Sequence, residues 1–265
     1  MKRNGNEKME AVLLTRPTTK VAVLTLNRPD ARNALGPELV ALLPAKLDEL
    51  EKEGRTRAVV ITGTGSAFCA GADLATLKSL QSATAEENDR DCEALRNLYK
   101  RMVTSPLPLV AAVNGPALAG GCGLASLCDI VIASQSAVFG YPEVRIGFVA
   151  AMVLVFLSRQ VGERLARELL LTGRTLKAEE AREAGFVSRV VPDGDLLDEA
   201  VKTASQVASN APSAVALTKE LLWHTSGLPV GDALGLASRL NVYARSNPEM
   251  REGLSAFFEK RKPQW

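Results

Sequence analysis

Histidine is almost absent from the 265-residue chain, because His224 is the only one. A zinc site built on several imidazole ligands is therefore not expected. A serine hydrolase is disfavoured too, since it needs a histidine and a G-x-S-x-G nucleophile elbow, and the chain has no such elbow. His224 lies near the end of an expected helix, where the helix dipole favours a cation, and we interpret it as structural.

Aromatic residues make up only 5% of the chain, and the formal net charge is +2. This small charge, without a basic stripe interleaved with aromatics, argues against a nucleic-acid partner and against an acidic membrane surface. No apolar run approaches the roughly 20 residues that a membrane-spanning helix needs. The sequence therefore predicts a soluble protein with neither nucleic acid nor membrane as a partner.

The four cysteines form no C-x-x-C pair, and no secretory segment precedes them. We therefore interpret them as free, semi-buried thiols, which are typical of proteins in a reducing compartment. We therefore predict a cytoplasmic location.

The residues that are present indicate an α/β fold with a sizeable core, since 46% are apolar and 23% charged. Residues 36–53 show helical spacing, with Pro37 near the start and Gly54 just after the end. Short β-branched, apolar runs alternate with helical patterns, which predicts mostly parallel strands, and the first two runs read as a hairpin. The expected strands cover residues 11–15, 20–27, 57–62, 108–115, 129–134 and 188–191.

From about Ala150 the pattern is almost entirely helical, and only residues 188–191 read as a strand. No internal repeat or low-complexity linker interrupts the chain. We expect a flexible N-terminus at 1–10, a core at 11–200, and a helical C-terminal region at 201–265 that packs on the core and on a neighbouring subunit.

The segment GPALAGGCGLA, residues 115–125, places four glycines after an apolar strand, where we expect a turn into a helix over 123–128. It is not a phosphate-binding loop of the G-K-[ST] kind, and Ser126 replaces the third glycine of a dinucleotide fingerprint. Backbone amides aimed at a developing negative charge remain, because a strand-to-helix junction leaves N–H groups free and glycine lets a ligand approach them. A second turn of small residues, CAGAD at 69–73, would add another amide if both turns face one cleft.

Five segments resemble, in order, the landmarks of the crotonase superfamily, and together they span essentially the whole chain. They are LNRPDARNAL (26–35), AFCAGADL (67–74), AAVNGPALAGGCGLASLCDI (111–130), FGYPEVRIG (139–147) and FFEKRKP (257–263). The resemblance implies a crotonase-like spiral of ββα units with a helical C-terminal trimerisation region. It also implies an acyl-CoA thioester substrate, a homotrimer or dimer of trimers, no metal, and no cofactor, because coenzyme A is part of the substrate.

The same resemblance assigns site residues by matching position. The two oxyanion amides fall on Ala72 and Gly120, and the catalytic carboxylate falls on Glu143. Lys260 and Arg261 would reach CoA phosphates, including those of a neighbouring subunit, and a solvated helix end is the alternative for this pair. The candidate substrate and CoA contacts are Ala70, Gly71, Asp73, Leu74, Gly121, Gly123, Lys260 and Arg261.

The chain departs from the two-glutamate hydratases of the family at Gly123, where the first glutamate would stand. Two interpretations of Gly123 stay open: close packing, or room for a branched or carboxylated acyl chain. Glu143 remains, and burial beside a thioester would raise its pKa and suit it to acid–base work near neutral pH.

The resemblance therefore predicts an enoyl-CoA hydratase, a carbon–oxygen lyase that adds water reversibly to a 2-enoyl-CoA with a single glutamate. The segment GYPEVRIGFVAAMV at 140–153 resembles hydratases of branched substrates such as 3-methylglutaconyl-CoA. Two alternatives stay open, a Δ3,Δ2-enoyl-CoA isomerase and a catalytically inactive acyl-CoA binding protein.

Overall fold

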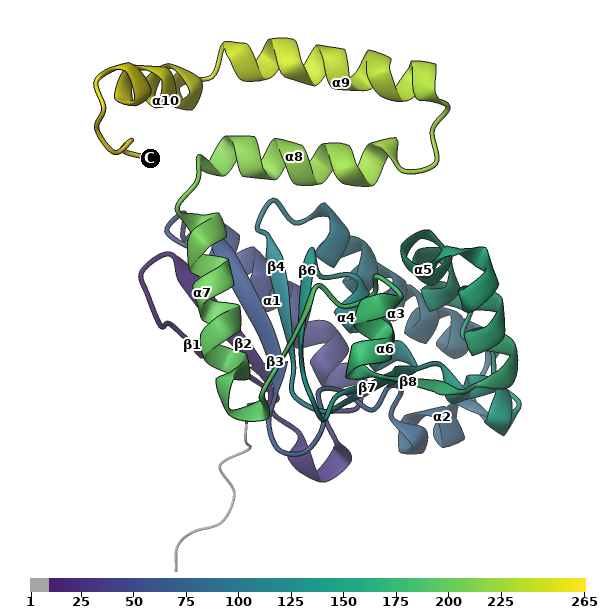
Figure 1. Cartoon of the computed structure of the whole chain (residues 1–265). Coiled ribbons are helices and arrows are strands. Elements are labelled where there is room, and N and C mark those ends of the chain that lie inside the picture. Colours follow the sequence, from purple (N-terminus) through teal and green to yellow (C-terminus); the bar gives the residue numbers. More distant parts are fainter. Residues whose placement is uncertain (1–9) are drawn as a thin grey trace, which may run out of the picture.

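The computed structural model describes residues 10–265 (Figure 1). The flexible terminus predicted at residues 1–10 therefore lies, except for its last residue, outside the described residues. Within the described part, strands and helices alternate as far as α7, and only helices follow it. The prediction of a mixed α/β protein is confirmed.

A six-stranded sheet forms the centre of the core, in the order β1-β2-β3-β4-β6-β9. The first two strands are antiparallel, as the predicted hairpin requires, and all the others pair in parallel. The strands are β1 Val12–Thr15, β2 Val21–Leu26, β3 Ala58–Gly63, β4 Leu109–Val113, β6 Ile130–Ser134 and β9 Arg189–Val191.

A second, three-stranded sheet consists of β5 (Pro116–Leu118), β7 (Val138–Gly140) and β8 (Thr175–Lys177). These strands were not predicted from the sequence, because each has three residues and β5 begins inside a glycine- and proline-containing stretch that is typical of turns. The pairing of β5 with β7 places the glycine stretch directly beside the segment that leads to Glu143.

Helices cover both faces of the large sheet. On one face lie α1 (Pro37–Lys52) and α3 (Ala85–Thr104), and on the other lies α7 (Leu196–Ala208). The predicted spacing of α1 is confirmed for Leu39, Leu43, Leu47 and Leu50, which are fully buried, whereas Leu42 is only partly buried. The shorter or more distant elements are η1 Pro29–Ala31, α2 Leu74–Leu80, α4 Gly120–Ser126, η2 Pro142–Ile146, α5 Ala151–Thr172, α6 Ala178–Glu183 and η3 Asp193–Asp195.

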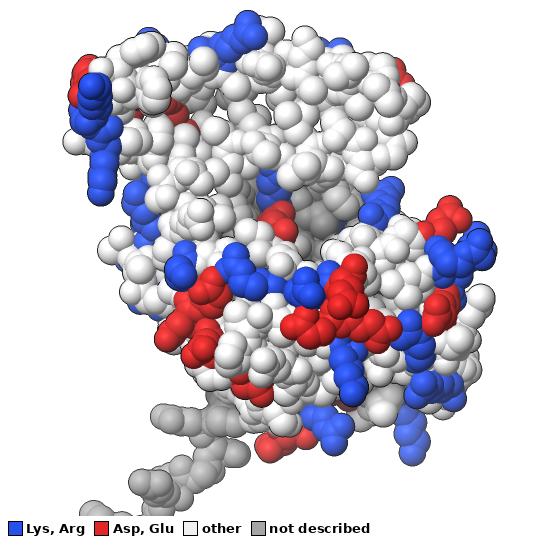
Figure 2. Space-filling view, in the orientation of Figure 1, with Lys and Arg blue, Asp and Glu red and all other residues white. Residues whose placement is uncertain are grey.

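The C-terminal region consists of α8 (Pro212–Thr225), α9 (Val230–Arg245) and α10 (Pro248–Phe258). Figure 1 shows α8 across one end of the core, with α9 on the side of α8 that faces away from the core. Charged side chains gather over the core in Figure 2, while the face of α8 and α9 seen there carries few of them. No helix among residues 10–265 is long and apolar enough to cross a membrane.

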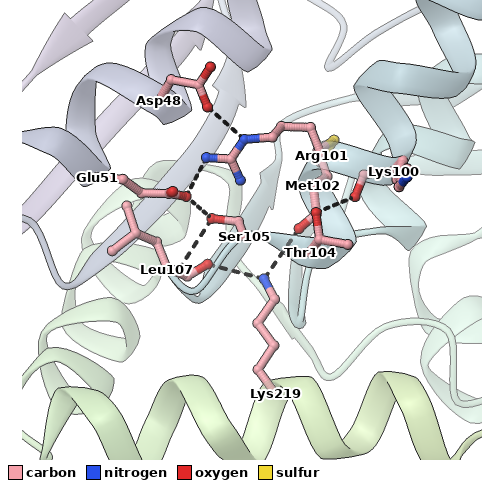
Figure 3. Close-up of polar contacts among 9 residues, drawn as sticks. All are labelled: Asp48, Glu51, Lys100, Arg101, Met102, Thr104, Ser105, Leu107 and Lys219. Carbon is pink, nitrogen blue, oxygen red and sulfur yellow. Dashed lines mark hydrogen bonds and ion pairs between the residues drawn. The ribbon is translucent and has the colours of Figure 1, made fainter.

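A buried lysine attaches α8 to the core. The Nζ of Lys219 donates to the carbonyl oxygens of Leu107 at 3.1 Å and Met102 at 3.4 Å (Figure 3), and it pairs with the Asp129 carboxylate at 2.7 Å. The same Asp129 oxygen accepts the Leu109 amide at 2.7 Å, at the start of β4. Neighbouring pairs, Ser105 with Glu51 and Arg101 with Asp48 and Glu51, join α1 to the end of α3.

Replacing Asp129 with asparagine is expected to lower the free energy of unfolding by about 3 kcal/mol, because it leaves the Lys219 ammonium buried without a counter-ion. This figure is the lower end of the usual range for a broken buried pair, since the Asp129 side chain keeps 32% of its exposure. Urea unfolding measures the change. The matched control is Glu163→Gln, which breaks an exposed pair with Arg167 and is expected to be near neutral. Equal losses for the two variants would contradict the anchoring role.

Candidate active site

The two turns of small residues lie against each other. The amide of Cys69 donates to Pro116 O at 3.2 Å, and the amide of Leu118 donates to Cys69 O at 3.0 Å. Gly71 has a φ of +96°, and a Cβ added to it would lie 2.8 Å from Leu118 O and only 3.4 Å from the amide nitrogen of Gly120. The two turns are therefore adjacent, which is the condition for their amides to serve one oxyanion.

Two backbone amides at this place are free. Within residues 10–265, neither the amide of Ala72 nor that of Gly120 has a hydrogen-bond acceptor. Gly120 is the first residue of α4, which starts three residues earlier than the sequence predicted. Ala119 before it has a φ of +51°, a strained conformation for a residue with a side chain. Free donors beside a strained residue are typical of a site built for an oxyanion.

Asp73 and Leu74 follow the first turn and begin α2. The Asp73 carboxylate accepts the amides of Ala75 at 3.0 Å and Thr76 at 3.4 Å, and it pairs with Arg28 at 3.0 Å. Partial burial opposes ionisation, but these hydrogen bonds hold the pKa of Asp73 below its ordinary value. The Asp73 carboxylate is therefore occupied by contacts within the protein. The Leu74 side chain, in contrast, is 68% exposed. Of the other candidate contacts on this turn, Ala70 is partly buried and Gly71 is buried.

Glu143 lies in η2, three residues after β7. Its side chain is buried, its residue is only 8% exposed, and its Oε2 has no hydrogen-bond partner in the described structure. Burial raises the pKa of Glu143, although a backbone hydrogen bond partly opposes this. Burying a carboxylate without a hydrogen-bond partner destabilises the folded state, and such groups are typical of functional sites.

Glu143 lies close to the Gly120 turn. The amide of Ala119 donates to Gly140 O at 2.8 Å, and this bond brings η2 to the start of α4. The hydroxyl of Tyr99, on α3, donates to Gly120 O at 3.0 Å. Burial is the main reason that the pKa of Tyr99 is raised, and the negative charge of Glu143 raises it further. The segments that carry the Gly120 amide and the Glu143 carboxylate are thus neighbours in the fold.

Two buried cysteines border this site, but neither is a nucleophile. Gly121 packs so closely that a Cβ on it would lie 2.1 Å from Cys69 O. Burial raises the pKa of Cys69 and of Cys122 to about 12, so both thiols stay protonated at neutral pH. Glu143 is thus the ionisable group beside the amides that is suited to proton transfer, because burial raises its pKa above the ordinary value of a glutamate.

Gly123 is buried, and its surroundings are filled. A Cβ added to Gly123 would lie 2.3 Å from Cγ1 of Val153 and 3.1 Å from the Tyr99 hydroxyl. Val153 is itself only 3% exposed. Of the two interpretations of Gly123, the structure favours close packing and speaks against room for a branched acyl chain at this point.

Lys260 and Arg261 directly follow the C-cap of α10, and Figure 1 shows α10 far from α2 within the same chain. Arg261 is held by two carboxylates, Glu252 and Glu259, at 2.6 Å each. These two cations are therefore not brought to the amide site by their own subunit, and a role toward the CoA of a neighbouring subunit stays a prediction.

Tyr99 is the site residue that sequence reasoning missed. It occurs in a polar, helix-forming stretch, and a single tyrosine in such a stretch usually fills the core. Only its hydroxyl contact with Gly120, 21 residues further along the chain, distinguishes it. No local pattern contains that information.

Two free amides beside a buried, protonatable carboxylate define a class of proteins that stabilise an oxyanion while a carboxylate transfers a proton. Residues 16–265 match the family model described as enoyl-CoA hydratase/isomerase, so the chain belongs to this family of enzymes. Membership of the crotonase superfamily, predicted from the five segments, is thereby confirmed.

Individual relatives agree. The chain is 50% identical over 245 residues to a putative enoyl-CoA hydratase of Thermus thermophilus, covering 92% of this chain and 97% of the relative. It is 37% identical over 246 residues to a short-chain-enoyl-CoA hydratase of Clostridium acetobutylicum, covering 92% and 93%. The crystal structure of an enoyl-CoA hydratase of Mycobacterium smegmatis superposes with a TM-score of 0.90 at 33% identity, covering 96% and 98%.

Proposed function

We propose that this chain is an enoyl-CoA hydratase, which adds water reversibly to a 2-enoyl-CoA thioester with Glu143 as the only catalytic carboxylate. The observation that carries the proposal is the partner-free Oε2 of Glu143, buried beside the free amides of Ala72 and Gly120. The names of the relatives support the reaction class, since they are described as enoyl-CoA hydratases. Coenzyme A belongs to the substrate, and the reaction uses no other cofactor.

The reaction follows from these groups. The amides of Ala72 and Gly120 donate to the thioester oxygen, which makes the Cβ of the enoyl group electrophilic. Glu143 takes one proton from a water molecule while the water oxygen bonds to Cβ, and the π electrons move through Cα to the thioester oxygen. Glu143 then returns its proton to Cα, so that atoms and charges balance.

The acyl group is a finer part of the proposal. Because Val153 fills the space beside Gly123, a branched substrate is supported only by the resemblance of residues 140–153. The short-chain relative favours a small, unbranched substrate such as crotonyl-CoA.

An isomerase is the second candidate, because a single carboxylate is enough to move a proton from Cα to Cγ without water. Glu143 would then act alone, and the two amides would hold the same oxyanion. An inactive acyl-CoA binding protein is disfavoured, because evolution has little reason to keep a partner-free carboxylate buried in a binding site.

Mass spectrometry of crotonyl-CoA, a 3-enoyl-CoA and 3-methylglutaconyl-CoA, each incubated with the purified protein, tests the proposal. A product heavier by one water supports hydration, and the substrate that reacts fastest defines the acyl group. Conversion of the 3-enoyl thioester at unchanged mass supports the isomerase. No change in any of the three would overturn both reactions.

The proposal includes a trimeric unit, as a homotrimer or a dimer of trimers, because the C-terminal helices expose large apolar side chains. Light scattering on the eluting protein is expected to give three or six times the 28.3 kDa chain mass. A monomer would contradict this part of the proposal, since it would leave these side chains in water. They are Leu222, Val230, Leu234, Val242, Tyr243, Phe257 and Phe258, each at least 60% exposed.

The predicted cytoplasmic location also belongs to the proposal. It is supported by four free cysteines, three of them buried.

A further inference from the structure

The hydroxyl of Tyr99 lies at the centre of the candidate site. Its oxygen is 3.1 Å from the position that a Cβ would take on Gly120, and also 3.1 Å from that position on Gly123. Gly120 is partly exposed whereas Tyr99 is 2% exposed, so the hydroxyl lies on the buried side of Gly120. Glu143 is close enough for its charge to act on this hydroxyl.

The tyrosine ring is held firmly. Tyr99 is 2% exposed, and its ring contacts Phe156 edge to face, with ring centroids 6.4 Å apart and planes at 87°. Phe156 in turn packs against Trp223 of α8 at 5.9 Å. Three helices therefore fix the direction of the hydroxyl.

The hydroxyl of Tyr99 can accept a further hydrogen bond but cannot donate one. Its single proton is donated to Gly120 O, and within residues 10–265 its oxygen accepts no hydrogen bond, so lone-pair capacity is free. Because its pKa is raised, the hydroxyl stays neutral and neither gives nor takes a proton at working pH. What it can do is accept a hydrogen bond from a small donor beside Gly120.

A hydratase with one carboxylate needs a second contact for its water. Glu143 accepts one of the two water hydrogens, but a single hydrogen bond lets the water rotate about that bond. A second acceptor fixes the lone pair that attacks Cβ, and orientation of this kind lowers the barrier. Val153 presents only carbon atoms to Gly123, and the protonated thiols of Cys69 and Cys122 are weak acceptors, so the Tyr99 hydroxyl is the polar side-chain atom nearest to both Gly120 and Gly123.

We propose that the Tyr99 hydroxyl accepts the second hydrogen of the attacking water and so orients that water toward Cβ, while Glu143 takes the first. This inference rests on the proposed hydration and names the second polar group that the reaction uses. Tyr99 keeps its own proton throughout, so the balance of the reaction is unchanged. Isomerisation needs no water and therefore does not need this contact.

The test compares two reactions in one variant. Tyr99→Phe is expected to lower kcat for hydration of crotonyl-CoA at least tenfold, and to lower the ratio of hydration to 3-enoyl-CoA isomerisation by a similar factor. A merely structural role would lower both reactions together and leave the ratio unchanged. The melting temperature and the binding of butyryl-CoA, which cannot react, report on the fold and on the site.

Two further variants keep the result interpretable. Tyr243→Phe makes the same change on α9, outside the candidate site, at a side chain that is exposed in the single chain and belongs to the proposed trimer contact; it keeps the ring for that contact and is expected to leave the ratio unchanged. Tyr99→His, which keeps a polar group with a free lone pair, is expected to recover part of the hydration rate, and it replaces Tyr99→Phe if that variant does not fold.

The outcomes separate this inference from the function on which it rests. An unchanged hydration rate in Tyr99→Phe, or a parallel fall in both reactions, overturns the role of Tyr99 while the hydratase stands. A wild-type protein that hydrates none of the three thioesters overturns the function itself, and the role of Tyr99 with it.

Discussion

Replacing Glu143 with glutamine is expected to lower kcat for crotonyl-CoA hydration by about 10²–10⁴-fold, the usual contribution of general acid–base catalysis. Glutamine has nearly the shape of glutamate, but it can neither take a proton from water nor return one to Cα. Binding of butyryl-CoA should stay within a factor of a few, because the Ala72 and Gly120 amides are untouched. Steady-state kinetics and titration calorimetry measure the two quantities.

The pH dependence provides a second measurement on the same residue. Hydration needs the ionised carboxylate, and burial raises the pKa of Glu143 in the folded protein. The acid limb of kcat/KM for the wild-type protein should therefore lie above the usual range of a glutamate. A limb within the ordinary range would show that another group controls the rate.

Stability should change in the opposite sense to activity. Because the pKa of Glu143 is higher in the folded than in the unfolded chain, its contribution to stability is complete below the unfolded pKa and is lost as the pH rises through the folded pKa. At neutral pH the wild-type protein therefore bears the penalty of a buried charge, and Glu143→Gln does not. Melting curves should show the variant gaining stability relative to wild type between acid and neutral pH. No such gain, together with retained turnover, would remove Glu143 from the mechanism.

The parts of this fold that were predictable from sequence are those with a long, regular pattern. Helix α1 shows its buried face as a leucine every three or four residues, and Pro44 inside it does not break that pattern. The central parallel strands of the large sheet are mostly apolar, because both faces are covered. Such patterns extend over enough residues for periodicity to identify them.

The parts that escaped prediction depend on contacts between distant residues. The strands of the small sheet are too short to show a period, and α4 begins with glycines that hide its first turn. Residue type at the candidate site was informative only for Glu143 and the glycines. The sequence alone could not show whether Gly123 serves close packing or makes room for the acyl chain. Val153 answers this, because it lies 30 residues further along the chain and fills the space beside Gly123.

Replacing Gly71 with alanine is expected to lower kcat by about 10²–10³-fold, the usual effect of losing one oxyanion donor. Gly71 lies where the turn that carries Ala72 contacts the turn that carries Gly120. Its added Cβ would lie 2.6 Å from the Cβ of Ala119 and 2.8 Å from Leu118 O, with the Gly120 amide nitrogen at 3.4 Å. Since atoms do not approach this closely, the turn that carries Ala72 must move away from the turn that carries Gly120. The two amides would then no longer converge on one oxygen.

Backbone strain alone must be separated from this displacement, because Gly71 has a φ of +96° and alanine at a positive φ costs about 1–2 kcal/mol. Gly54, just after α1, provides the matched control, with a φ of +69° and nothing within 4 Å of an added Cβ. Gly54→Ala should lose a similar amount of stability in urea unfolding and keep its kcat. If both variants keep full kcat, the two turns do not form the oxyanion site. If only Gly71→Ala loses activity while it still melts cooperatively, the spacing of the two amides determines the rate.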